Sequence, residues 1–140
     1  MAKLNDTTVP AAFQPYLEPG EQLKHWGFGV KQPNMLLMIP LFLLGILPGA
    51  IAVALLTKNY VAGLTDRRFI VLRFSGKLNV KEIMEYRLNN LPQVEASTGP
   101  IFTVIKIHDA QKPFVAKFHR MGMPNNRAHA MAMAAALTGK

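Results

Sequence analysis

The chain has 140 residues, enough for one domain, and half of them are hydrophobic. It contains no cysteine, which excludes a disulfide framework, a thiolate metal site and a cysteine nucleophile. The formal net charge of +8 lies after the apolar middle of the chain, because residues 1–34 are neutral overall and residues 58–140 carry 13 basic against 5 acidic residues.

The first thirty residues divide into two patterns. Residues 1–20 show no hydrophobic period and contain three prolines, which predicts an arm laid over the domain with Phe13, Tyr16 and Leu17 as candidate anchors. Residues 21–30 alternate in part between apolar and polar side chains, which predicts a first strand even though two glycines weaken it.

An uncharged apolar run follows, from Met35 to Leu56. As a straight helix it would reach about 33 Å, the thickness of one bilayer core. Prolines interrupt it at Pro40 and in Leu47-Pro48-Gly49, so three interpretations remain open: one kinked span, a hairpin that enters and returns, and a buried core helix. The candidate membrane-inserted residues are Met35, Leu36, Leu41, Phe42, Leu47, Ile51 and Leu55.

The strands expected on either side of this run favour the hairpin. If residues 21–30 pair with residues 60–65 in one sheet, both ends of the run lie on the same side of a bilayer. We therefore predict a re-entrant or interfacial hairpin over residues 35–57 that turns near Leu47-Pro48-Gly49. The basic excess predicts that the domain formed by residues 21–34 and 58–140 lies on the cytoplasmic side of the membrane.

Short alternating segments separated by turn residues fill most of the remaining chain. They predict strands over residues 60–65, 68–74, 81–88, 93–98, 101–108 and 113–119. A final helix is expected to begin at Pro124 and to end at Gly139. Seven strands closed by one helix make an antiparallel α+β domain. Its predicted core between sheet and helix contains Ile105, Phe114, Phe118 and Met131.

Three features together resemble a known family. Pro19-Gly20-Glu21 opens the first strand, an apolar insertion follows, and residues 64–71 read Leu-Thr-Asp-Arg-Arg-Phe-Ile-Val. Over residues 19–138 the chain resembles the bacterial pleckstrin-homology-like (PH-like) family with an associated membrane segment, although that segment is usually a longer two-helix hairpin. The resemblance implies a seven-stranded PH-like sheet or barrel closed by a C-terminal helix. It also implies a binding or assembly module without a common enzymatic activity, with lipid, peptide or self-association as its partners.

No pattern in the chain predicts catalysis, a metal site or a cofactor. The four histidines lack the helical spacing of a zinc site, although His108 and His119 could approach each other across neighbouring strands. The glycines form no phosphate-binding loop. Asp66 and Arg67 are expected to set the geometry of a turn. The chain is therefore expected not to be an enzyme.

The basic residues suggest a membrane-facing surface. In an up-and-down meander the turn at residues 75–80 returns to the end of the sheet that carries the insertion, whereas Arg67 and Arg68 lie at the other end. The candidate headgroup-binding residues are Lys31, Lys58, Arg73, Lys77 and Lys81.

Other interpretations of the charge and of the apolar run stay open. The cations could be merely solvated, and nucleic acid is disfavoured because no recognition motif accompanies the charge. A partner could be a larger membrane protein complex or a second copy of the chain. In a different class, the chain is a soluble structural protein whose apolar arm packs against itself or a larger complex.

Overall fold

The computed structural model describes residues 4–31, 39–40, 43, 45–75 and 78–139. Seven strands make up most of it, close to the predicted ranges. They are β1 (Leu23–Lys31), β2 (Lys58–Thr65), β3 (Arg68–Ser75), β4 (Asn79–Arg87), β5 (Gln93–Thr98), β6 (Phe102–His108) and β7 (Phe114–His119). A short 3₁₀ turn, η2 (Leu88–Asn90), joins β4 to β5.

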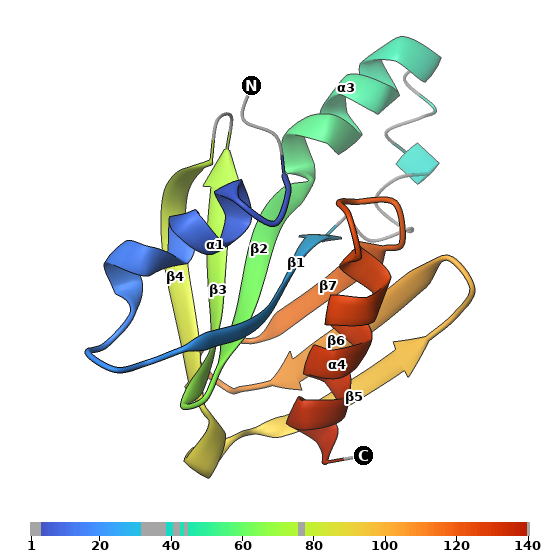
Figure 1. The fold of residues 1–140 in the computed structure, drawn as a ribbon. Helices are drawn as coiled ribbons and strands as arrows, with labels where there is room; N and C mark the ends of the chain where they lie inside the picture. Colours follow the sequence, from blue (N-terminus) through green and yellow to red (C-terminus); the bar gives the residue numbers. More distant parts are fainter. Residues whose placement is uncertain (1–3, 32–38, 41–42, 44, 76–77, 140) are drawn as a thin grey trace.

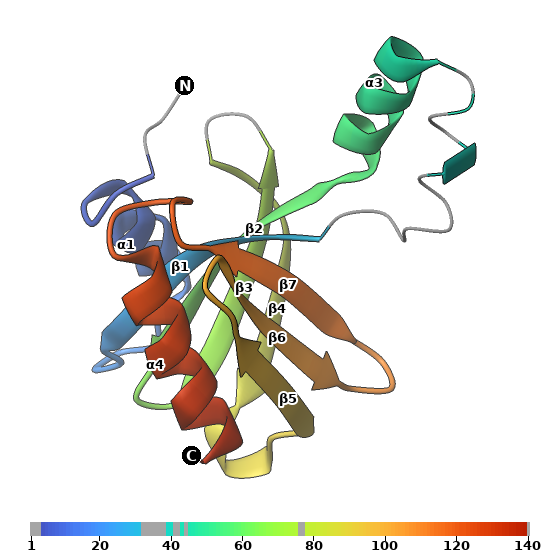
Figure 2. The ribbon, with the colours of Figure 1, turned by 90° about the vertical axis from the view of Figure 1, so that its right-hand side faces the viewer.

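All strand pairs are antiparallel, and the strands form one sheet in the order β4-β3-β2-β1-β7-β6-β5. β1 is therefore central and holds the two halves of the sheet together (Figures 1 and 2). Within the described residues β4 and β5 do not pair, so the sheet is strongly bent but open rather than a closed barrel. The prediction of seven antiparallel strands is confirmed.

Helix α4 (Asn126–Thr138) packs on one face of the bent sheet and covers the main core (Figure 2). Of the four residues predicted to form the core between sheet and helix, three are buried: Ile105, Phe114 and Phe118. The prediction for Met131 is wrong, because its side chain is 41% exposed while Met133 is fully buried. The buried face of α4 follows the helical period through Ala130, Met133, Ala134 and Leu137, and position 131 lies outside that stripe.

The N-terminal arm forms helix α1 (Thr8–Phe13) and a 3₁₀ turn, η1 (Gln14–Tyr16), on the other face of β1 and β2 (Figure 1). The Asn5 side chain accepts the backbone N–H groups of Thr7 and Thr8, both at 2.8 Å, and so caps α1. Phe13 is fully buried beside Gly63, where an added Cβ would lie 2.9 Å from two ring carbons of Phe13. A glycine at this position of β2 therefore lets the arm approach the sheet closely.

Helix α3 (Ile46–Leu56) lies in the insertion between β1 and β2. It runs without interruption through Leu47-Pro48-Gly49, so the predicted turn at that point is wrong. Pro48 is the third residue of the helix, where a missing N–H removes no helical hydrogen bond, and the Gly49 N–H already donates to the Gly45 carbonyl at 3.0 Å. Proline here begins a helix instead of breaking one.

The strands on either side of the insertion pair as expected. The register aligns Lys31 at the end of β1 with Lys58 at the start of β2, so both ends of the insertion meet at one end of the sheet. From there α3 extends away from the sheet (Figures 1 and 2).

Candidate functional site

Helix α3 exposes apolar side chains. Of the residues predicted to enter a membrane, Leu47 is 71% exposed and Ile51 is 53% exposed. Ile39, Leu43, Ile46 and Leu56 of the same insertion are also exposed. Leu55 belongs to α3, but its side chain, like Met35, Leu36, Leu41 and Phe42, lies outside the described part of the structure. Within that part, no helix combines the length and hydropathy needed to cross a bilayer.

The predicted headgroup cations gather at the base of the insertion. Lys31, Lys58 and Lys81 are exposed. The β3–β4 turn returns to this end of the sheet, because β2 pairs Asn59 with Phe74 at the end of β3. A bulge in the β3–β4 register leaves Lys81 between two paired positions.

Two of the five candidate cations differ from this group. The Arg73 Nε lies 3.7 Å from Glu82 Oε1 on the neighbouring strand, so its charge is partly neutralised. Lys77 lies outside the described residues.

The opposite end of the sheet carries a buried ion pair that sequence reasoning missed. The guanidinium of Arg68 donates from Nε and Nη2 to the two carboxylate oxygens of Glu21, at 2.9 and 2.7 Å, and to the Tyr16 carbonyl at 2.6 Å. It also contacts Glu85 on β4. The Arg68 guanidinium lowers the pKa of the Glu21 carboxyl to about 2, and Glu21 in turn raises the pKa of Arg68. The pair ties the arm to the sheet.

Thr65 and Arg68 explain the Leu-Thr-Asp-Arg-Arg motif. The Thr65 hydroxyl donates to Glu21 at 2.6 Å and accepts the backbone N–H groups of Arg67 and Arg68 at 3.0 and 2.9 Å. Arg67 lies 3.5 Å from Glu18 at the surface. The Leu-Thr-Asp-Arg-Arg motif therefore stabilises the β2–β3 turn, at the end of the sheet opposite to the insertion. The sequence signal for the Arg68–Glu21 pair was the run Thr-Asp-Arg-Arg together with a glutamate just before β1.

Two histidines meet at a place that the sequence does not indicate. His25 on β1 and His129 on α4 face each other with their Nδ1 atoms 3.2 Å apart, and the Trp26 ring packs on His129. Burial, and then the neighbouring His25, lower the pKa of His129. Within the described residues, no group of three or more metal-ligating side chains is present.

His108 and His119, which the sequence left free to approach each other, do not do so. β6 pairs its first residue, Phe102, with His119, and its last residue, His108, with Gln93 of β5. The two histidines therefore lie at opposite ends of β6.

Arginines and lysines differ in whether they form ion pairs within the protein. In the described part of the chain, every ion pair has an arginine or a histidine as its cation. None of the described lysines therefore takes part in one of these ion pairs. The lysine charges remain available to an outside partner.

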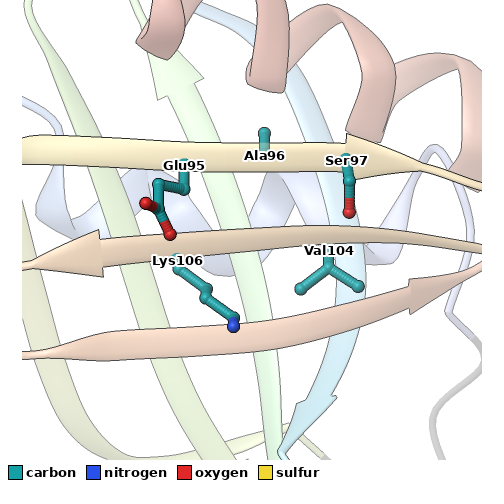
Figure 3. A pocket seen from close by; sticks show the side chains of 5 residues that line it. All are labelled: Glu95, Ala96, Ser97, Val104 and Lys106. Carbon is teal, nitrogen blue, oxygen red and sulfur yellow. The ribbon is translucent and has the colours of Figure 1, made fainter.

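The face of β5, β6 and β7 opposite to α4 carries both polar and apolar side chains and is shallowly hollowed. One hollow, of about 170 Å³, is lined by Glu95, Ala96, Ser97, Val104 and Lys106 (Figure 3). A second, of about 160 Å³, lies beside it and is lined in part by Lys31, Lys106 and His108. Neither encloses a ligand-sized chamber, so this face resembles a contact surface more than an active site.

Comparison with known proteins gives the fold. No family model and no curated protein sequence matches the chain. The hSac2 domain from human phosphoinositide phosphatase Sac2 is similar in structure, with a TM-score of 0.52 at 12% identity over 93% of this chain and 76% of that chain. The pleckstrin homology domain from Shewanella amazonensis SB2B covers 96% of this chain and 98% of that chain at 15% identity, with a TM-score of 0.44. The similarity to the hSac2 domain concerns the fold alone.

Proposed function

We propose that this protein is a non-enzymatic, membrane-anchored PH-like module for binding or assembly. Its helix α3 enters the bilayer from the cytoplasmic side. Lys31, Lys58 and Lys81 then lie at the level of anionic headgroups. A PH-like fold suggests a lipid- or protein-binding module, and the chain's own residues favour lipid.

The observation that carries the proposal is the exposed apolar surface of α3. Ile46, Leu47, Ile51 and Leu56 are all at least 48% exposed, on a helix that extends away from the domain. Eleven helical residues reach about 16 Å, roughly half of a bilayer core. Such a helix can enter one leaflet while Lys31 and Lys58, at the two ends of the insertion, stay on the same side of the membrane.

The same surface supports a second function of another class. Exposed apolar residues on a projecting helix also fit a groove on a protein, so the chain could be a soluble assembly protein whose α3 packs against another copy or a larger complex. The lysines favour the membrane, because an apolar groove alone gives no role to the paired positions Lys31 and Lys58.

Vesicle flotation of the full chain tests the proposal with one pair of variants. Ile51→Glu removes an exposed apolar side chain from α3, and Met131→Glu makes the same kind of change at an exposed position on α4. Burial of one isoleucine stabilises the bound state by about 2–3 kcal/mol, so Ile51→Glu should weaken vesicle binding about 30- to 150-fold. Met131→Glu should bind like the wild type.

Two outcomes decide between the functions. If Ile51→Glu and the wild type float equally well, α3 does not enter the bilayer. If neither protein binds vesicles, but the wild type forms oligomers that Ile51→Glu abolishes, the assembly function replaces the membrane function. An alkaline carbonate wash of native membranes provides the second reading, because an inserted helix resists it and a peripheral contact is released.

A further inference from the structure

We propose that the outer face of β6 and β7 is a second headgroup-contacting surface, which lays the domain against an anionic bilayer while α3 inserts. This inference rests on the membrane function proposed above and adds the orientation of the domain. The outer face consists of Phe102, Val104, Lys106 and His108 of β6 and Val115, Lys117 and His119 of β7.

The strand period separates this face from the core. Alternate residues of β6 and β7 are buried beneath α4, among them Ile105 and Phe118. The residues between them point to the other side of the sheet. The register pairs Lys106 with Val115 and Val104 with Lys117, so the two ammonium groups stand on diagonal positions of neighbouring strands, with apolar side chains between them.

Carboxylates do not neutralise these lysines. Glu95, across from Lys106 on β5, lies 3.2 Å from the Nε2 of His108 instead, and the Lys106 side chain reaches away from it over β7 (Figure 3). The Asp109 carboxylate in the β6–β7 turn accepts the backbone N–H groups of Gln111 and Lys112 at 2.8 and 3.0 Å. These hydrogen bonds keep the Asp109 carboxylate in the turn, so it does not pair with Lys106 or Lys117.

Lys117 lies over an aromatic ring. Its Nζ lies 5.6 Å from the centroid of Phe102, one strand away, a geometry that favours a cation over the ring face. The ammonium group therefore gains a weak attraction to the ring and keeps its charge.

The outer face ends close to the base of the insertion. β1 pairs with β7 at Val30 and Lys117, and the next residue, Lys31, lines one hollow together with Lys106 and His108. Lys31 is in turn the strand partner of Lys58, where β2 leaves α3. By the strand period Lys31 and Lys58 lie on the side of the sheet that carries Tyr60, so they meet Lys106 only around this hollow at the end of the strands.

This proximity indicates which partner could cover both surfaces. A partner that contacts both surfaces has to be apolar where it meets α3 and anionic where it meets the lysines of the outer face. An anionic bilayer has both properties, with hydrocarbon below a layer of phosphate and carboxylate groups. Charge complementarity and proximity to the base of α3 therefore assign the bilayer surface as the partner of this face.

The test compares two double charge reversals in the full chain. Lys106→Glu/Lys117→Glu changes the outer face, and Lys24→Glu/Arg127→Glu makes the same change in net charge at exposed positions at the far end of β1 and on α4. Partitioning onto phosphatidylcholine vesicles with and without phosphatidylserine is measured at about 0.1 M salt, where charges more than about 10 Å from the membrane are screened. Equal melting temperatures establish that both variants are folded.

The outer-face variant should lose at least about 25-fold in binding to phosphatidylserine vesicles, about fivefold for each cation removed. The control should lose at most a few-fold. Equal losses in the two variants would show that net charge and not this face attracts the membrane, which overturns the inference. Vesicle binding that depends on Ile51 but is unchanged in the outer-face variant also overturns it, while the proposed function stands.

A labelling experiment gives an independent reading. Because the chain has no cysteine, Lys117→Cys and Lys24→Cys each provide a single site for a fluorescent label. Headgroup-level quenchers should quench the label at position 117 and leave the label at position 24 bright. The reverse pattern contradicts the proposed orientation. Binding of the outer face to polyglutamate but not to vesicles would assign it to an acidic protein and also overturns the proposal.

Discussion

Removing the Arg68 guanidinium should destabilise the fold more than removing any other arginine in the described residues. Both partners of the Arg68–Glu21 pair are buried: the side chains are 7% and 0% exposed. The Glu21 carboxyl has a pKa of about 2 in place of its ordinary 4.5, a difference that corresponds to about 3 kcal/mol. In Arg68→Met this carboxylate stays buried without its partner, so the free energy of unfolding at pH 7 should fall by about 3–5 kcal/mol.

The pH dependence follows from the direction of the shift. Because the pKa of Glu21 is lowered in the folded protein, its contribution is fully present above about pH 4.5 and is lost as the pH falls toward 2. In Arg68→Met the same carboxyl is desolvated without a cation, which raises its pKa and favours the protonated form. The difference in stability between wild type and variant should therefore shrink as the pH falls from 7 to 4.

Urea denaturation at a series of pH values measures both effects. Arg87→Met is the matched control, because Arg87 forms its ion pair with Glu18 at the surface, with 44% and 36% of the two side chains exposed. It should cost no more than about 1 kcal/mol. Glu21→Gln/Arg68→Met should recover part of the loss, since no uncompensated charge stays buried. A loss below about 1 kcal/mol in Arg68→Met, or an unchanged pH slope, would refute the reasoning.

Two further substitutions test the packing on the two faces of the sheet. Phe118→Ala should lower the free energy of unfolding by about 3–5 kcal/mol, because Phe118 is fully buried under α4, whereas the same change at the exposed Phe102 should cost far less. Urea titration gives both values, and equal costs would mean that the strand faces are inverted. Gly63→Ala should cost about 1–3 kcal/mol and loosen the arm, since the new Cβ would lie 2.9 Å from the Phe13 ring. Proteolysis of the arm measures this, with Gly99→Ala, whose nearest neighbour lies at 3.7 Å, as the control.

The sheet could be predicted from the sequence because its signals are local. Alternation of side chains and the turn residues between them place each strand within about two residues, as for β2, which was predicted over residues 60–65 and spans Lys58–Thr65. The pairing of β1 with β2 followed from strand order alone. An open sheet differs from a barrel only in whether its two edge strands meet, which no local pattern records.

The predictions were wrong where the outcome depended on the orientation of one helix or on the residue at which a helix begins. Met131 and Met133 have the same composition around them, and only the orientation of α4 on the sheet buries one and exposes the other. At Pro48 the same residue type breaks a helix in its interior and is accepted in its first turn, so its effect depends on where the helix begins. His25 and His129 are 104 residues apart and meet only through tertiary packing.

Lysine and arginine have separate roles in this fold, and their chemistry explains why. Arg68 uses a planar fork that matches two carboxylate oxygens at once, which suits a buried pair that holds the arm to the sheet. Lysine is a strongly hydrated point charge that loses less by staying in water, and Lys31, Lys58, Lys106 and Lys117 lie on the surface without carboxylate partners. Substitutions of these lysines should therefore change membrane binding while leaving the melting temperature almost unchanged. Substitution of Arg68 should do the opposite, so the two properties can be measured independently in one protein.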